Sequence, residues 1–297
     1  MSTTTGAKNA GTVERRKRTQ AQEIWRNFRR NRGAMLGLFV LAFFFFMAAT
    51  GDLWIDQEKV IGMDVVNRLQ WPSAEHWFGT DEMGRDLFWR VLYGSKYSLA
   101  IGFVAVAVSV IVGVPLGAIA GFYGGRTENI IMRVCDMFGA IPGVLLAMVI
   151  VAVLGTGSIN LMIAVGVSGV PQFVRITRAA ILTVKNQEYV EAARALGKTD
   201  GYIIARHILP NCLSPIIVQT TIRVAGAIIQ ASGLSFLGLG IAPPQPEWGA
   251  LLNAGNAFVL TNNYLTIFPG LAIMLTVLSF NLVGDGLRDA MDPKLKR

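Results

Sequence analysis

Six long apolar runs, separated by polar segments, set the pattern of this chain. Each run is close to the roughly twenty residues that a helix needs to cross about 30 Å of hydrocarbon. The runs cover 34–50, 97–123, 134–154, 159–176, 213–237 and 266–287. The pattern predicts an all-α membrane protein with six transmembrane helices.

Composition agrees with a membrane protein. Of the 297 residues, 53% are hydrophobic and 15% are charged, and the mean hydropathy is +0.48. A soluble domain of this length carries less apolar matter. A cleaved signal peptide is the alternative reading of the first run, because basic residues including Arg15 and Arg16 precede it. That run starts late and lacks a clear small-residue cleavage site after it, so we expect 34–50 to be a span.

The distribution of basic residues predicts the orientation. With a cytoplasmic N-terminus, the cytoplasmic segments, counted from the run edges with Arg175 included, hold 21 of the 27 Lys and Arg residues, the extracytoplasmic segment 52–96 holds five, and Arg223 alone falls in the middle of a run. Lys and Arg are enriched on the cytoplasmic side of membrane proteins, so both termini are predicted to be cytoplasmic. The net charge of +8 then reflects topology, and no nucleic-acid partner is expected.

The runs divide the chain into five predicted parts. These are a cytoplasmic basic segment with an amphipathic helix at 1–33, the first transmembrane helix at 34–50, an extracytoplasmic segment at 51–96, a five-helix core at 97–287 with a cytoplasmic coupling loop at 180–212, and a cytoplasmic tail at 288–297.

Small residues and prolines inside the spans predict how the helices pack. Gly113, Gly117 and Gly121 recur every four residues, so one stripe of their helix lacks side chains and a neighbouring helix can approach closely. Prolines inside or near the ends of spans predict kinked helices. These are Pro115, Pro142 and Pro171.

Signatures of nucleotide or metal chemistry are weak. Gly197, Lys198 and Thr199 resemble the end of a phosphate-binding loop, but Ala192 stands where that loop needs glycine, and the preceding residues favour a helix over a strand. We therefore expect no ATP binding, no cofactor and no enzymatic activity in this chain. The few Cys and His residues do not form a metal signature, so no metal site is expected and the cysteines should serve packing. They are Cys135, Cys212, His76 and His207.

The segment between the fourth and fifth runs carries the most informative motif. Glu191, Ala192 and Ala193 begin a slim helix, Gly197 can take the left-handed conformation that ends it, and Leu209 and Pro210 precede the next span. A solvated loop is the plain reading of Glu-Ala-Ala alone. The full spacing resembles the EAA loop of permease subunits in binding-protein-dependent ABC importers, with one departure: His207 stands where that family has isoleucine, and Ile208 follows it.

The resemblance extends over nearly the whole chain and narrows to the C-type subunit of dipeptide and oligopeptide importers. Before the second run stands a segment similar to the extracytoplasmic GTDxxGRD motif of that subfamily, and a second motif follows the fifth run. The first comprises Gly79, Thr80, Asp81, Gly84, Arg85 and Asp86, and the second Pro246, Glu247, Trp248 and Gly249. Taken singly, these residues could also be helix caps and a stiff loop.

The resemblance implies a type I ABC importer permease fold in the bacterial cytoplasmic membrane. It also implies a heterodimer with a second permease, two cytoplasmic ATPases that bind ATP and Mg, and an extracytoplasmic substrate-binding protein. The coupling loop, with Glu191, Ala192, Ala193, Gly197, Leu209 and Pro210, would contact the ATPases. The implied cargo is a di- or oligopeptide.

Two alternatives remain open at the level of sequence. Importers of nickel, glutathione or other small solutes share these motifs. An ion-coupled secondary transporter would need paired broken helices or buried acids, and only Asp136 and Asp285 come near the membrane interior.

Arg223 interrupts the fifth run about ten residues from its start. An arginine at such a depth usually faces a bundle interior or a wet pathway. Either it lines the pathway and binds peptide carbonyls or a carboxylate, or it forms a structural pair, for which Asp136 is a candidate partner.

Overall fold

The computed structural model describes residues 20–291. Within that part the chain is helical, with no named strand and one isolated bridge between Thr80 and Asp86. The elements are α1 (Gln20–Phe28), α2 (Arg32–Trp54), α3 (Gln57–Ile61), η1 (Val65–Asn67), α4 (Leu87–Tyr123), α5 (Gly125–Gly139), α6 (Gly143–Leu154), α7 (Ser158–Val184), α8 (Glu188–Ala195), α9 (Asp200–Ile203), η2 (Ile204–Ile208), η3 (Leu209–Cys212), α10 (Leu213–Phe236), α11 (Trp248–Asn256) and α12 (Tyr264–Met291).

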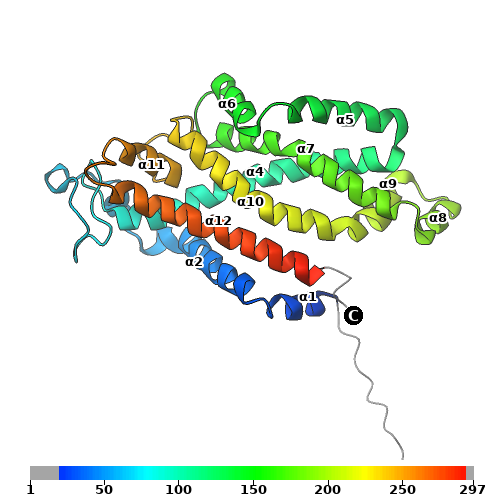
Figure 1. Ribbon diagram of the computed structural model, residues 1–297, viewed down its shortest axis with the longest axis horizontal. Coiled ribbons are helices and arrows are strands. Elements are labelled where there is room, and N and C mark those ends of the chain that lie inside the picture. The colour runs from blue at the N-terminus through cyan, green and yellow to red at the C-terminus, as the bar shows by residue number, and fades with distance from the viewer. Residues whose placement is uncertain (1–19, 292–297) are drawn as a thin grey trace, which may run out of the picture.

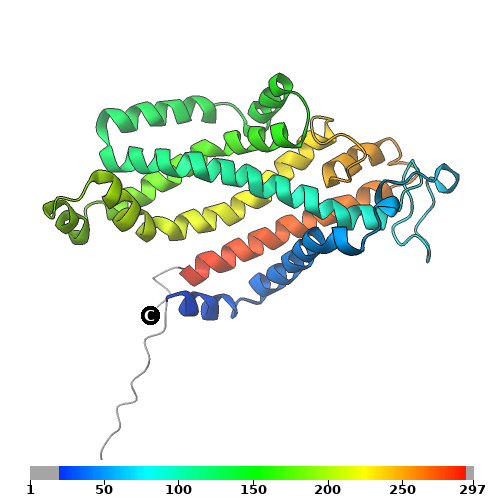
Figure 2. The same ribbon diagram turned by 180° about the vertical axis from the view of Figure 1, so that it is seen from behind.

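The long helices lie along one axis and form an elongated bundle (Figures 1 and 2). Helix α1 and the end of α12 lie toward the same end of the bundle as α8 and α9, while α11 and the segment between α2 and α4 lie at the opposite end. Five helices of the described residues are long and apolar enough to cross a membrane, and the number is six when the bent pair of α5 and α6 is counted as one span. An even number of crossings places both described ends on one side, as the sequence predicts.

The third predicted span, 134–154, differs from expectation. The structure breaks it into α5 and α6, which meet at 86° across Ala140 to Pro142. Pro142 supplies the break because a proline cannot donate the backbone hydrogen bond that would carry α5 onward. Figure 1 shows α5 running beside α7 and α6 turning off the line of α5, while α6 stays in contact with α7. The predicted kink at Pro142 is therefore a broken helix, whereas α4 and α7 continue through Pro115 and Pro171.

The ends of several spans also lie outside the predicted limits. Helix α4 begins at Leu87, ten residues before the apolar run, because the Asp86 carboxylate accepts hydrogen bonds from the Phe88 and Trp89 amides. Helix α7 continues to Val184, eight residues beyond the end of the apolar run at 176. Hydropathy detects only the stretch in hydrocarbon, and these helices extend beyond it.

The glycine stripe of α4 packs against α7, as predicted. A Cβ at Gly113 would lie 2.6 Å from the Cβ of Phe173, and one at Gly117 would lie 2.6 Å from the Val174 carbonyl oxygen. Both distances are shorter than van der Waals contact. Helices α4 and α7 thus approach each other closely along this stripe, which is how small residues bring membrane helices together.

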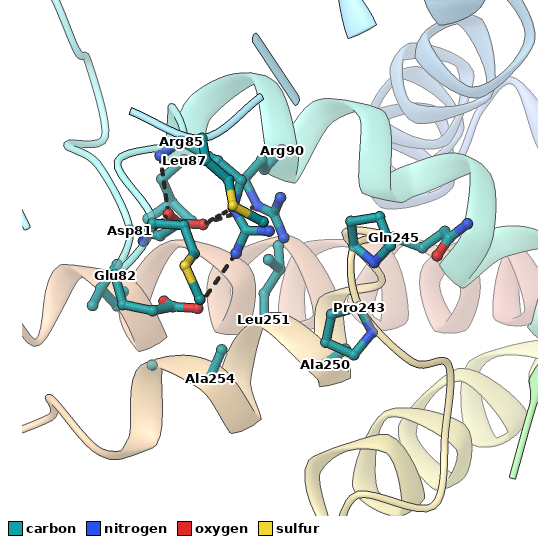
Figure 3. A pocket seen from close by; sticks show the side chains of 15 residues that line it. Asp81, Glu82, Arg85, Leu87, Arg90, Pro243, Gln245, Ala250, Leu251 and Ala254 are labelled. Carbon is teal, nitrogen blue, oxygen red and sulfur yellow. Dashed lines mark hydrogen bonds and ion pairs between the residues drawn. The ribbon is translucent and has the colours of Figure 1, made fainter. Parts of the chain in front are cut away.

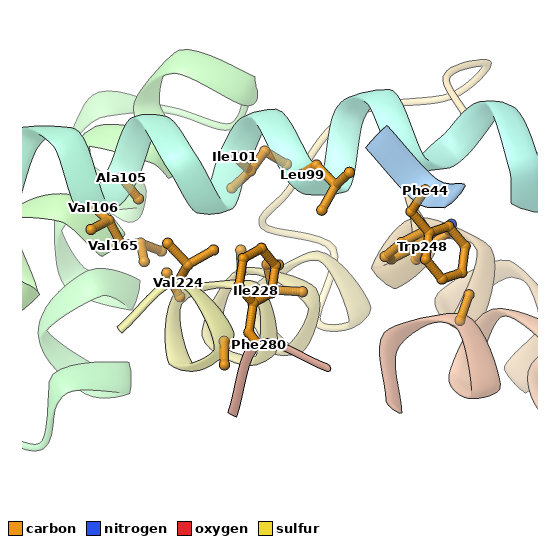
Figure 4. Close-up of a cluster of buried hydrophobic side chains, with 14 of the residues drawn as sticks. Phe44, Leu99, Ile101, Ala105, Val106, Val165, Val224, Ile228, Trp248 and Phe280 are labelled. Atoms are coloured by element: carbon orange, nitrogen blue, oxygen red, sulfur yellow. The ribbon is translucent and has the colours of Figure 1, made fainter. Parts of the chain in front are cut away.

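The main core lies between α4, α7, α10 and α12, with α2 and α11 completing it (Figure 4). Trp248 is fully buried there, edge-on to Phe44 at a ring-centroid distance of 5.3 Å. Its indole Nε1 donates to the Val91 carbonyl oxygen at 2.8 Å. Trp248 is therefore a core residue, whereas the exposed Trp71 and Trp77 lie in the extracytoplasmic segment. The first apolar run is part of the same packed bundle, since α2 contributes Phe44.

Candidate functional site

The coupling loop folds as the sequence predicts. Helix α8 covers Glu188–Ala195, and Gly197 follows it with φ +69°, in the left-handed region that favours glycine. The Lys198 amide donates back to the Ala193 carbonyl at 3.2 Å, which closes the helix end. The Gly-Lys-Thr sequence is thus a helix end followed by α9, and its local structure is not that of a phosphate-binding loop.

One face of α8 packs on the protein's own chain. Val190 and Ala193, three residues apart, are buried at 0% and 5% exposure. They join a small apolar cluster at the end of the bundle that also contains Phe122, Ile203 and Ile208. The family resemblance predicts that Ala193 contacts the ATPases. The structure instead buries it on its own chain, because it lies on the same helix face as Val190 and packs in the cluster with Ile203 and Ile208.

The opposite face of α8 is open. Glu191 and Ala192 are exposed there, as is Gly197. Two large apolar side chains are exposed beside them: Tyr189 at 41% and Leu196 at 76%. We call the exposed set Tyr189, Glu191, Ala192 and Leu196 the α8 face. An apolar patch on a short helix beyond the end of the bundle is typical of a surface that another protein covers.

The remaining two predicted loop residues lie where the coupling loop joins α10. Leu209 and Pro210 form a 3-10 turn that leads into α10. Leu209 packs against the small cluster, while Pro210 is exposed. Ile208 is fully buried in the same cluster, so the isoleucine that stands one place later than in the family pattern still packs. Cys212 is buried there as well, and Cys135 is buried on α5; both are free thiols that serve packing.

The first extracytoplasmic motif is a tight turn held by its own polar groups. The Asp81 carboxylate accepts from the backbone amides of Met83 and Arg85 at 2.9 and 3.0 Å, and from Arg85 Nε at 2.7 Å. Thr80 Oγ1 donates to the Asn67 carbonyl and accepts from the Gln70 amide. These contacts shape the loop and leave few of its polar atoms free.

The two glycines and the last acid of that motif have backbone roles. Gly79 and Gly84 have φ values of +77° and +78°, and a Cβ at Gly79 would lie 2.7 Å from a ring carbon of Tyr264. Asp86 caps α4 and contacts His76 Nδ1 at 2.9 Å. Sequence reasoning did not point to Tyr264, whose hydroxyl donates to the Thr80 carbonyl at 2.9 Å.

The second extracytoplasmic motif joins α11 to the core. Glu247 is 1% exposed, and its carboxylate accepts from the amides of Gly249 and Ala250 at 2.9 Å each, capping α11. Burial raises the pKa of Glu247 above its usual range, although those amides oppose the shift. A Cβ at Gly249 would lie 2.5 Å from the Ser232 carbonyl, and one at Gly94 would collide with the Pro246 carbonyl. The motif therefore fixes α11 against α4 and α10.

The first extracytoplasmic motif faces the segment just before the second motif across a cavity of about 300 Å³ (Figure 3). One wall carries Asp81 and Arg85 of the first motif, and the other carries Pro243 to Gln245, just before the second. Arg90 also lines the cavity; it is 3% exposed, donates to the Val60 carbonyl and lies 3.3 Å from the Asp81 carboxylate. Sequence reasoning missed Arg90 because it placed the start of the span beyond it.

Arg223 lies in the middle of α10, and its partner is not the predicted one. Asp136 forms an exposed ion pair with Arg175 at 2.9 Å. Arg223 Nη2 instead lies 3.4 Å from Ser168 Oγ and 3.3 Å from Gln230 Oε1, both neutral groups. The structural pairing with Asp136 is therefore wrong.

Comparison with known proteins places the chain in a class. Residues 113–297 match the family described as "Binding-protein-dependent transport system inner membrane component", and residues 19–72 match the "N-terminal TM domain of oligopeptide transport permease C". The chain belongs to this family. It is a C-type permease subunit of an ABC importer, a multi-pass protein of the bacterial cytoplasmic membrane, and its family is one of transport permeases that act with ATPase and substrate-binding partners.

Named relatives cover almost the whole chain. The dipeptide transport system permease protein of Alkalihalophilus pseudofirmus is 44% identical over 93% of this chain and 90% of that protein. The glutathione transport system permease protein of Pectobacterium atrosepticum is 46% identical over 94% of this chain and 93% of that protein. Its counterpart from Escherichia coli O6:K15:H31 is 48% identical over 94% and 92%.

A solved structure supports the fold. The MetNI methionine ABC transporter, in an inward-facing conformation, gives a TM-score of 0.57 at 19% identity, covering 69% of this chain and 98% of that one. At that identity the likeness concerns the fold alone, which is the type I importer permease fold expected from the sequence.

Proposed function

We propose that this chain forms, with a second homologous permease, the translocation pathway of an importer for small peptides. The names of its relatives support this proposal: one is named for dipeptides and others for glutathione, which is itself a modified tripeptide. The common chemistry is a short peptide with a free carboxylate. Nickel, the other alternative from the sequence, shares none of it.

The α8 face is the proposed contact with two cytoplasmic ATPases, which bind ATP and Mg and perform the hydrolysis. This chain itself binds no cofactor in the proposal. The observation that supports the contact with the ATPases is that α8 has one buried and one exposed face. Val190 and Ala193 anchor the helix to the bundle, while the α8 face is exposed. A helix anchored in this way moves with the ends of α4 and α10, whose Phe122 and Ile216 share its cluster. Force from a partner would thus reach the spans.

The two extracytoplasmic motifs, in this proposal, give the substrate-binding protein a fixed surface. Their residues are engaged with each other and with the spans, so their role is to hold shape: Glu247 caps α11, and Asp81 holds the turn that precedes α4. A rigid outer surface suits delivery from a separate protein, because little ordering is needed on contact.

Uptake by the natural host tests the cargo class. Deleting the gene should abolish accumulation of a radiolabelled dipeptide and of glutathione at low concentration, and plasmid-borne wild-type chain should restore it. Uptake of radioactive nickel serves as the matched measurement. Loss of nickel uptake with unchanged uptake of both peptides would overturn the peptide assignment.

A further inference from the structure

Arg223 lies at mid-depth in the bundle. Ten residues of α10 precede it and thirteen follow it to Phe236, which at 1.5 Å per residue is about 15 Å and about 20 Å from the two helix ends. A guanidinium at that depth is costly in hydrocarbon, so it is expected to face protein or water. Arg223 is partly exposed in the single chain.

Two glycines make room for the guanidinium. A Cβ at Gly169 on α7 would lie 3.0 Å from Arg223 Nε, and one at Gly226 on α10 would lie 3.3 Å from Nη1. Any larger residue at 169 would press on the arginine head. The side chain therefore passes close to both glycines and extends toward the extracytoplasmic end of α10, where it contacts Gln230.

The groups around this guanidinium leave its charge uncompensated. Ser168 and Gln230 are neutral, and their contacts with Nη2 are long, at 3.4 and 3.3 Å. Arg223 Nε is buried and has no hydrogen-bond partner. Among residues 20–291, no carboxylate forms an ion pair with Arg223. A buried N–H donor without an acceptor, on a guanidinium whose charge has no ion-pair partner, indicates that an anionic ligand could bind here.

The surroundings form a polar surface at the break between α5 and α6. Arg223 and Gln230 are seven residues apart on α10, and Ser168 and Arg175 are seven apart on α7, so each pair shares a helix face. Gln230 Nε2 donates to the Gly143 carbonyl at the start of α6, at 2.8 Å. Toward the cytoplasmic end, the exposed ion pair of Arg175 with Asp136 continues the polar surface.

We propose that Arg223 is a carboxylate-binding site on the wall of the translocation pathway, at the α5–α6 break. Its ligand is the terminal carboxylate of the passing cargo, which the planar guanidinium can hold with two parallel hydrogen bonds. Neutral neighbours suit this role, because a pathway site must bind and also release. The inference rests on the proposed function, since it takes the cargo to be a peptide.

Labelling at the neighbouring Ser168 tests whether water reaches this site and whether the site is positively charged, and it leaves Arg223 itself in place. In the assembled importer, Ser168→Cys in a background with Cys135→Ala and Cys212→Ala should react with water-soluble thiosulfonate reagents. The quantity measured is the ratio of the labelling rate with the negatively charged reagent to the rate with the positively charged one. This ratio should be severalfold higher with Arg223 present than in the same chain carrying Arg223→Gln. Absence of labelling in every nucleotide state, or a ratio that Arg223→Gln does not change, would overturn the proposal. Either result would also follow if Arg223 paired with an acid of the second permease.

Uptake separates this site from the proposed function. Arg223→Gln should lower dipeptide uptake by about tenfold or more at normal levels of assembled importer, and Arg223→Lys should recover part of it. Arg126→Gln, at an exposed arginine near the cytoplasmic end of α4, is the control and should leave uptake unchanged. If wild-type importer carries no peptide, the proposed function fails. If wild-type carries peptide and Arg223→Gln carries it equally well, the carboxylate site alone fails.

Discussion

Substitution by aspartate should destabilise α8 strongly at Ala193 and very little at Ala192. At Ala193, which is 5% exposed, the new carboxylate enters the apolar cluster of Val190, Ile203 and Ile208. An uncompensated buried charge costs about 3–5 kcal/mol. At Ala192, which is exposed, only helix propensity changes, at about 0.7 kcal/mol or less.

Hydrogen exchange measures this difference directly. A loss of 3–5 kcal/mol raises the open population of a local unit by about a hundredfold to several thousandfold, since each 1.4 kcal/mol is tenfold. The amides of Leu196 and Lys198, which donate to the Ala192 and Ala193 carbonyls, report on the helix end. In the purified chain in detergent, Ala193→Asp should lose their protection and Ala192→Asp should keep it. Equal protection in the two variants would refute the assignment of an inner and an outer face.

Four further variants test contacts in this geometry. In the assembled importer, Ala192→Asp should lower both uptake and cargo-stimulated ATP hydrolysis, because it places a charge on the α8 face; full values of both would contradict the coupling role. Glu247→Ala should destabilise the purified chain by about 2–4 kcal/mol, through loss of the α11 cap and of acceptors for buried donors, in thermal unfolding. Burial raises the pKa of Glu247 in the folded state, so the stability that this shift contributes is complete below the pKa of the unfolded state and is lost as the pH rises to the folded pKa. Glu247→Gln should therefore flatten the dependence of stability on pH between these two values. An unchanged profile would show that the Glu247 carboxyl has the same pKa in the folded and unfolded states. Gly249→Ala should cost about 1–3 kcal/mol, since its Cβ would lie 2.5 Å from the Ser232 carbonyl, and an unshifted melting temperature would refute that contact.

Apolar runs were enough to predict the number of crossings and the membrane class. They did not give the ends of the helices, because caps such as Asp86 decide where α4 begins, and hydropathy carries no signal from a cap. They also did not give the 86° break, since Pro142 marks a place where a helix can bend and leaves the angle to the surrounding packing.

The helix and turn of the coupling loop could be predicted, but not which face of the helix packs on the bundle. The positions of the helix and of the Gly197 turn followed from local residue types, which act within a few residues. Which alanine faces inward depends on contacts with Ile203 and Ile208, further along the chain. The three-residue spacing of Val190 and Ala193 was the available signal for the inner face.

Contacts between distant segments were beyond the sequence. The Ser98 hydroxyl on α4 accepts from the Trp248 amide, 150 residues away, and the Tyr264 hydroxyl on α12 donates to the Thr80 carbonyl, 184 residues away. The neutral surroundings of Arg223 were likewise hidden, because Ser168 and Gln230 reach it from separate turns of α7 and α10. Only the fold brings these groups together.

Protection of the α8 face by the partner ATPases is the most direct test of the coupling claim. Leu196→Cys, in a chain with Cys135→Ala and Cys212→Ala, would be labelled with a water-soluble maleimide in solubilised membranes, from cells that make the whole importer and from cells that lack its ATPases. Val66→Cys, at an extracytoplasmic residue that is 91% exposed, is the control and should label equally in both. We predict that Leu196→Cys labels readily without the ATPases and is protected when they are present; equal labelling at position 196 in both membranes would contradict the claim.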